Sequence, residues 1–96
     1  MKRYVYENEQ RIQLHATEID ASEFDRLFDA WEGGRKAPHG IWYIDEGECW
    51  AGIDNYDGDF WVEPFGLLAD CIDWLEDDSK PAWEYESYNK TKKEVM

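Results

Sequence analysis

The chain has 96 residues and a formal net charge of −13, and this length fits one domain near the lower size limit for a single hydrophobic core. Hydrophobic residues make up 43% and aromatic residues 17%, so a compact core is feasible and disorder along the whole chain is excluded. The apolar runs are too short for a membrane helix or a signal peptide, and two cysteines are too few for a secreted disulfide framework. We therefore expect a single cytoplasmic domain over residues 1–89, followed by a flexible basic tail over residues 90–96.

Residues 3–17 are expected to be extended. Tyr4-Val5-Tyr6 is rich in strand-forming residues, and Ile12, Leu14 and Ala16 alternate with polar residues as in a half-buried strand. Asn8-Glu9 is interpreted either as a turn between two short strands or as a bulge in one long strand.

Local signals then predict a helix that ends at Gly33-Gly34. Asp20 or Ser22 can cap its start, and Glu23 follows Asp20 by three residues, as in a capping box. The apolar stripe at helical spacing consists of Phe24, Leu27, Phe28 and Trp31. Residues 35–40, which include Pro38, are predicted to form a loop.

Turn residues divide the next stretch into three predicted strands over residues 41–45, 48–54 and 59–65. Gly47 marks the first turn and residues 55–58 the second, which together predict an antiparallel meander. A second helix is expected at about residues 67–77, and residues 83–86 alternate like an edge strand. The predicted fold class is α+β, with an antiparallel sheet of about four to five strands and two helices packed on one face.

The predicted pairing assigns the side chains of the meander to two faces. A four-residue turn would place Asp54 beside Asp59 and Trp50 near Glu63. Cys49, Ala51, Ile53, Phe60 and Val62 then share a face that suits a core covered by helices. The opposite face would be an exposed surface of aromatic rings and carboxylates, formed by Trp50, Gly52, Asp54, Asp59, Trp61 and Glu63.

The excess negative charge is confined to the central segment. Residues 37–79 contain 12 acidic residues and neither Lys nor Arg, whereas the rest of the chain contains 11 acidic and 10 basic residues. The segment therefore carries −12 of the net −13. Unpaired like charges repel one another and lower stability. Either binding requires this charge, or it forms a solvated surface that keeps a small protein soluble.

Carboxylates fixed on strands and a helix can present charge at spacings comparable with DNA phosphates, roughly 6–7 Å along one strand. Such a surface competes for the Lys and Arg side chains of a nucleic-acid groove, and exposed tryptophans add anchors. The predicted partner is therefore a basic nucleic-acid-binding protein, and direct binding to nucleic acid or membrane is disfavoured. The candidate partner-binding residues are Asp45, Glu48, Trp50, Asp54, Asp57, Asp59, Trp61, Glu63, Asp70, Asp73 and Asp77.

A local resemblance supports this interpretation. The residues Ile53-Asp54-Asn55, Gly58-Asp59, Trp61-Val62-Glu63 and Phe65, followed by a helix ending Ile72–Leu75, resemble a pattern of small uncharacterised proteins of bacterial phages and conjugative elements. The short, acidic, aromatic-rich profile also resembles anti-CRISPR and anti-restriction proteins, several of which imitate DNA. The resemblance implies a bacterial host cell and, as partner, a CRISPR effector first and a restriction enzyme second.

Metal sites and catalysis are weaker alternatives. Residues 55–59 are similar to a calcium loop, but a calcium-binding loop with Gly58 at its sixth position would start at Ile53 and end at Pro64, which are not ligands. A looser calcium site at Asp57 and Asp59 stays open, and the few Cys and His residues form no zinc pattern.

We expect no enzyme and no cofactor, because no nucleophile, base and orienting group are linked in the sequence. The alternative function is an interaction module of a mobile element without mimicry, which self-associates through its aromatic face, for example as a homodimer.

Overall fold

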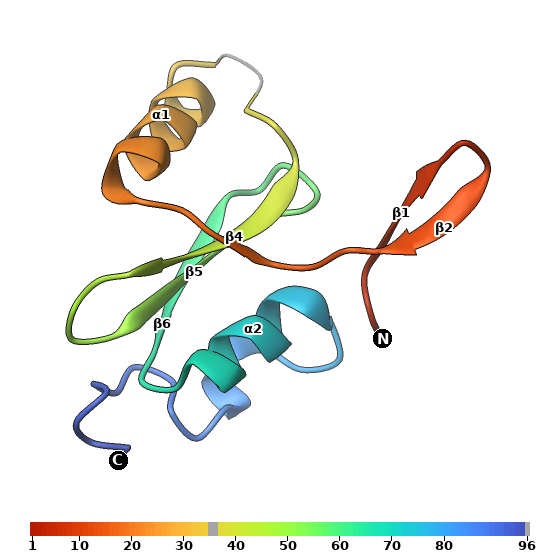
Figure 1. The fold of residues 1–96 in the computed structure, drawn as a ribbon. Helices are drawn as coiled ribbons and strands as arrows, with labels where there is room; N and C mark the ends of the chain where they lie inside the picture. The colour runs from red at the N-terminus through yellow and green to blue at the C-terminus, as the bar shows by residue number, and fades with distance from the viewer. Residues whose placement is uncertain (35–36, 96) are drawn as a thin grey trace.

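The computed structural model describes residues 1–34 and 37–95, and it shows an α+β fold (Figure 1). Its elements in chain order are β1 (Tyr4–Glu7), β2 (Gln10–Gln13), β3 (Thr17–Glu18), α1 (Ala21–Glu32), β4 (Gly40–Asp45), β5 (Trp50–Asn55), β6 (Trp61–Phe65), α2 (Leu68–Glu76) and the 3-10 helix η1 (Ala82–Glu84). The predicted α+β class and both helices are confirmed. Of the predicted loop over residues 35–40, residues 35 and 36 lie outside the described residues.

The main sheet has the strand order β3-β4-β5-β6, and β1 and β2 form a separate two-stranded sheet. The meander β4-β5-β6 is antiparallel as predicted, whereas β3 pairs with β4 in parallel. The expectation of a purely antiparallel sheet was therefore wrong. Because α1 lies between β3 and β4 in the chain, it provides the crossover that a parallel pair requires.

The register between β5 and β6 differs from the expected one by two residues. Asp54 lies opposite Trp61 and Trp50 lies opposite Phe65, because the turn extends to Phe60 before β6 begins. Gly58 and Phe60 both have positive φ, 95° and 52°, which lengthens this turn. A shift of two residues preserves the direction of each side chain, so Trp50 and Trp61 lie on the same face, as predicted.

The two helices cover opposite faces of the sheet, which corrects the prediction that both pack on one face (Figure 1). On one face, Phe24, Leu27 and Phe28 of α1 pack against a cluster that contains Ile44, Ala51 and Ile53. On the other, Cys71 and Leu75 of α2 pack with Ile41 and Phe65. Both faces of the central strands carry apolar or small residues, so both have to be removed from water.

Gly52 explains how α2 approaches the sheet on the face that we expected to be exposed. A Cβ atom at this position would lie 3.0 Å from the ring of Trp74 and 3.1 Å from the Sγ atom of Cys71. The missing side chain therefore leaves the space that the helix occupies. The expected aromatic and acidic surface survives only toward the edge strand β6.

The N-terminal hairpin resolves the alternative between a turn and a bulge. Asn8 and Glu9 form the turn between β1 and β2, and both have positive φ, 50° and 67°. Two such residues are typical of a type I′ hairpin turn. In Figure 1 the hairpin extends away from the main sheet, and Ile12 is exposed rather than half-buried.

The start of α1 is confirmed in detail. Asp20 is the N-cap, and its Oδ1 atom accepts a hydrogen bond of 2.8 Å from the backbone N–H of Glu23. The C-terminal end is also as predicted, since Gly33 follows the last helical residue and Gly34 has a φ of 75°.

Residues 83–86 do not form the predicted edge strand. Ala82, Tyr85 and Tyr88 contact the core at helical spacing, within η1 and the turns that follow it. Trp83 is 70% exposed while Tyr85 is 6% exposed, so the two do not share a face as an alternating strand would require. The alternation of aromatic and acidic residues in this short segment therefore does not indicate a strand.

The predicted tail makes specific contacts over residues 90–95, and Met96 lies outside the described residues. The backbone N–H of Lys92 donates a 2.6 Å hydrogen bond to the carbonyl oxygen of Glu48. A Cβ atom at Gly66 would lie 2.6 Å from the carbonyl oxygen of Thr91, so this segment passes directly over the glycine.

Candidate functional site

Basic residues from both ends of the chain reach the acidic central segment. Arg3 forms an ion pair with Asp54, Lys92 with Asp45, and Lys2 with Asp77. The expectation that these carboxylates have no basic partner was therefore wrong at three of the nine candidate carboxylates. The missing counter-charges are distant in sequence but close in space.

Asp54 belongs to the interior of the fold, being 7% exposed. Its Oδ2 atom accepts a 2.8 Å hydrogen bond from Nη1 of Arg3, and its Oδ1 atom accepts a 3.0 Å bond from the backbone N–H of Tyr56. The same guanidinium donates to the carbonyl oxygen of Leu75 at 3.1 Å and lies 4.9 Å from the ring centre of Tyr56. Asp54 therefore joins the N-terminal segment, β5 and α2, and its carboxylate is already occupied.

Asp45 and Trp50 are both in contact with Lys92. The ammonium lies 2.7 Å from Oδ1 of Asp45 and 4.1 Å from the ring centre of Trp50, a cation–π geometry. The hydrogen bond from Lys92 lowers the pKa of Asp45, aided by the backbone N–H of Gly47. Glu48 is exposed in the same turn.

Three further candidate residues on or next to α2 are held by neighbouring groups. Asp77 accepts a 2.6 Å hydrogen bond from the amino group of Met1, which together with Ser79 lowers the pKa of Asp77 to about 2. Asp73 accepts a 2.6 Å bond from the hydroxyl of Tyr85, and Asp70 accepts a 3.2 Å bond from the backbone N–H of Ser87. Burial and the bond to Asp73 raise the pKa of Tyr85.

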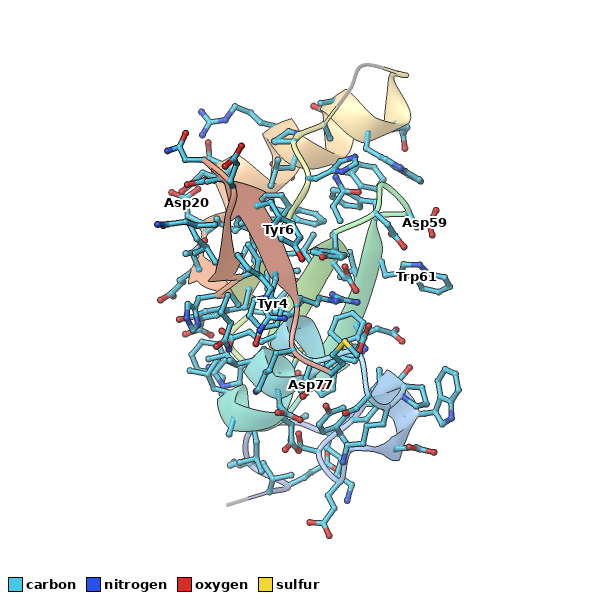
Figure 2. All side chains as sticks on the ribbon, turned by 90° about the vertical axis from the view of Figure 1, so that its right-hand side faces the viewer. Tyr4, Tyr6, Asp20, Asp59, Trp61 and Asp77 are labelled. Atoms are coloured by element: carbon cyan, nitrogen blue, oxygen red, sulfur yellow. The ribbon has the colours of Figure 1, made fainter. Side chains whose placement is uncertain are left out.

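Four candidate residues form what we call the acidic edge, which runs from the β5–β6 turn along β6: Asp57, Asp59, Trp61 and Glu63. Both aspartates are exposed, and Trp61 is 60% exposed. Figure 2 shows Asp59 and Trp61 on the same side of the molecule, pointing away from its body. Within residues 1–34 and 37–95, none of these three carboxylates forms an ion pair.

Phe60 fixes the direction of its two neighbours. Its ring is buried and stacks at 5.4 Å on Trp31 of α1, whose indole N–H donates to the carbonyl oxygen of Gly58 at 3.2 Å. With Phe60 anchored inward, Asp59 and Trp61 are turned toward solvent.

The eleven candidate residues do not form one surface. Asp45 and Glu48 lie at the β4–β5 turn, whereas Asp57 and Asp59 lie at the opposite end of β5. The six residues of β5 separate these turns by about 20 Å.

A groove beside the acidic edge was not predicted as a site. Its volume is about 260 Å³, and its lining comprises Asp54, Trp61, Glu63, Trp74, Pro81, Ala82 and Trp83. It brings rings from β6, α2 and η1 together with two carboxylates. The sequence contained a signal, since Trp83 follows Pro81 and precedes acidic residues. The predicted edge strand over residues 83–86 did not place Trp83 beside β6 and α2.

The two cysteine thiols are both withdrawn from water to some degree. Cys71 is fully buried, and burial raises the pKa of its thiol to about 12. Burial also raises the pKa of Cys49. In the described parts of the chain, no group of three or more His, Cys, Asp or Glu side chains is arranged to hold a metal ion. No helix over these residues is both long and apolar enough to span a bilayer.

Comparison of the chain with protein-family models, with curated proteins and with solved structures finds no match.

Proposed function

We propose that the chain is an acidic protein inhibitor that binds a basic, nucleic-acid-handling protein and blocks its DNA or RNA site by mimicry. The observation that supports this proposal is the acidic edge, where three carboxylates and a largely exposed tryptophan lie along one turn and the strand that follows it. Trp61 and Glu63 point to the same face of β6, and Asp57 and Asp59 precede them in the β5–β6 turn, so the exposed indole lies between carboxylates along the chain. A groove that holds phosphates through Lys and Arg would meet negative charge and an aromatic anchor here.

The contact surface that we propose is narrower than the sequence indicated. Asp45, Asp54 and Asp77 already have basic partners within the chain. Binding is therefore assigned to the acidic edge, with Asp70 and Asp73 on α2 as flanking charges. We propose a CRISPR effector as the first partner to test and a restriction enzyme as the second, in a bacterial host cell.

The test is competition for the nucleic-acid groove. The chain is added to the purified effector before or after its DNA, and loading is followed by electrophoretic mobility. A mimic excludes DNA when added first, and pre-bound DNA protects the effector, because the two ligands are mutually exclusive. A ternary complex with DNA in its normal groove contradicts the proposal.

Matched variants separate charge from fold. Neutralising Asp57, Asp59 and Glu63 to Asn or Gln should weaken binding and flatten its salt dependence, while changing the free energy of unfolding by no more than about 0.5 kcal/mol. Trp61→Ala should accelerate dissociation and leave the association rate nearly unchanged, because charge steers the encounter and anchors set the off-rate. Binding that is unchanged between low and high salt contradicts the electrostatic argument.

The alternative is an interaction module that self-associates without mimicry. One observation favours it, namely that β6 is the last strand of the sheet and exposes both Trp61 and Val62. Pro64 within this strand limits pairing with a second copy, because it has no N–H to donate. Sedimentation over a wide concentration range tests this alternative, and dimers abolished by Trp61→Ala would support it.

A further inference from the structure

The groove between β6, α2 and η1 has the chemistry of a site for one cationic side chain. Trp61 and Trp83 are 60% and 70% exposed, although large aromatic rings are normally covered. They line the groove together with Trp74, and the carboxylate of Glu63 lies at the same surface. Aromatic rings combined with a carboxylate attract a cation through both the ring faces and the charge.

The position of Trp74 is fixed by the fold, which makes one wall of the groove rigid. Its ring contacts the space above Gly52 and lies 5.5 Å from the ring of Phe65. Glu63 is also oriented, because both of its carboxylate oxygens lie 3.4 Å from the hydroxyl of Tyr88. These contacts hold an aromatic wall and a carboxylate in place before any ligand arrives.

The chain's own cations near these residues are already engaged within the chain. Arg3 is bound at 2.8 Å by Asp54, one of the two carboxylates that line the groove. Lys80, which precedes the groove residue Pro81, lies over the ring of Tyr85 at 4.1 Å. The buried carboxylate of Asp54 is thus compensated, whereas Glu63 has no ion pair among the residues that the structure describes.

We propose that this groove receives an arginine side chain of the partner protein, an inference that rests on the proposed binding of a basic partner. The planar guanidinium stacks on tryptophan and donates paired hydrogen bonds to a carboxylate, which an ammonium group cannot do in the same geometry. The volume of about 260 Å³ is below the roughly 300–1,000 Å³ of pockets for drug-sized ligands, so it suits one side chain. The arginine enters between Trp61 and Trp83, with its guanidinium toward Glu63.

The experiment uses the whole chain and short capped peptides, without the partner protein. Three tripeptides carry a central arginine, lysine or citrulline, where citrulline keeps the shape of arginine but has no charge. Binding is followed by the indole N–H signals of the six tryptophans in NMR titrations. We expect the arginine peptide to shift Trp61 and Trp83 with a dissociation constant on the order of millimolar, and citrulline to bind at least tenfold more weakly.

Two variants and one control identify the groove. Trp83→Ala and Glu63→Gln should each weaken the arginine peptide several-fold, whereas Tyr6→Ala, which removes an exposed ring from the separate β1–β2 hairpin, should not. If Trp83→Ala changes the spectrum of the whole domain, Glu63→Gln provides the same comparison. Equal binding of arginine and citrulline, equal binding of arginine and lysine, or shifts unaffected by both groove variants would overturn the proposal.

This result is separable from the proposed inhibition. Peptide binding at the groove without competition against DNA would keep the arginine site and reject mimicry. Competition against DNA with no peptide binding would reject the arginine site and keep mimicry.

Discussion

Asp54 allows a direct test of whether a candidate binding residue is structural. The sequence placed Asp54 on the contact surface, so its neutralisation was expected to weaken binding without unfolding the domain. In the structure, Asp54→Asn removes the charge that holds Arg3. It also replaces one of the two accepting carboxylate oxygens with an NH₂ group. The guanidinium then stays largely enclosed beside the ring of Tyr56, without the carboxylate and with the carbonyl oxygen of Leu75 as the hydrogen-bond acceptor that remains unchanged.

The size of the effect follows from burial. The side chains of Arg3 and Asp54 are 15% and 11% exposed, so water screens the pair only partly. Removing one member of a buried ion pair costs about 3–5 kcal/mol. Because the pair is partly exposed and Asn keeps one acceptor oxygen, we expect Asp54→Asn to lower the free energy of unfolding by about 2–3 kcal/mol. For a domain of this length, the melting temperature should fall by roughly 10–20 °C.

The assay is a double-mutant cycle by urea unfolding. Asp54→Asn, Arg3→Met and the double variant are compared with the parent chain, and Asp57→Asn serves as the exposed control. The losses in free energy of unfolding of the two single variants should sum to more than the loss of the double variant. Each single variant leaves the other member of the pair without its contact. A loss below about 0.5 kcal/mol for Asp54→Asn, equal to that of the control, would refute the structural role of this pair.

Two further predictions concern the core and the C-terminal segment. Gly66→Ala places a methyl group against the backbone at Thr91, so it should destabilise the domain by about 1–3 kcal/mol and raise hydrogen exchange at the Lys92 amide; unchanged exchange would argue against close packing here. Burial raises the pKa of Cys71 from 9.0 to about 12, so the unfolded chain binds fewer protons between these values and stability falls as pH rises. The slope from this thiol is at most about 1.4 kcal/mol per pH unit, and Cys71→Ala should flatten the pH dependence of unfolding; an unaltered slope would be inconsistent with a buried thiol.

Elements with local signals were predictable from the sequence. The cap at Asp20 and the glycines that follow α1 act within one turn of the backbone, so they determine that helix before any long-range contact forms. The meander was predictable for the same reason, since Gly47 and Gly58 occupy positions of positive φ that favour glycine.

The remaining features depend on contacts that local patterns do not contain. The expected register failed because the burial of Phe60 against α1 sets the length of the β5–β6 turn. The placement of α2 failed because the space above Gly52 is filled by Trp74, which lies 22 positions further along the chain. The groove required three tryptophans from three different elements, and no spacing in the sequence indicates that they meet.

At the candidate site, the exposure of Asp57, Asp59 and Trp61 was correctly anticipated from the turn and from the alternation of β6. The ion pairs that Asp45 and Asp54 form within the chain were not anticipated. Their partners, Lys92 and Arg3, come from opposite ends of the chain.

The pairing of chain ends with the centre also sets the order in which the molecule can assemble. Arg3 and Asp54 are 51 positions apart, and Lys92 and Asp45 are 47 positions apart. Closing such loops costs entropy before any contact forms, whereas the turns of the meander close at once. During folding, the central strands therefore have to approach one another while their carboxylates still lack counter-ions from the chain. Added salt, by screening that repulsion, should accelerate folding more than it slows unfolding.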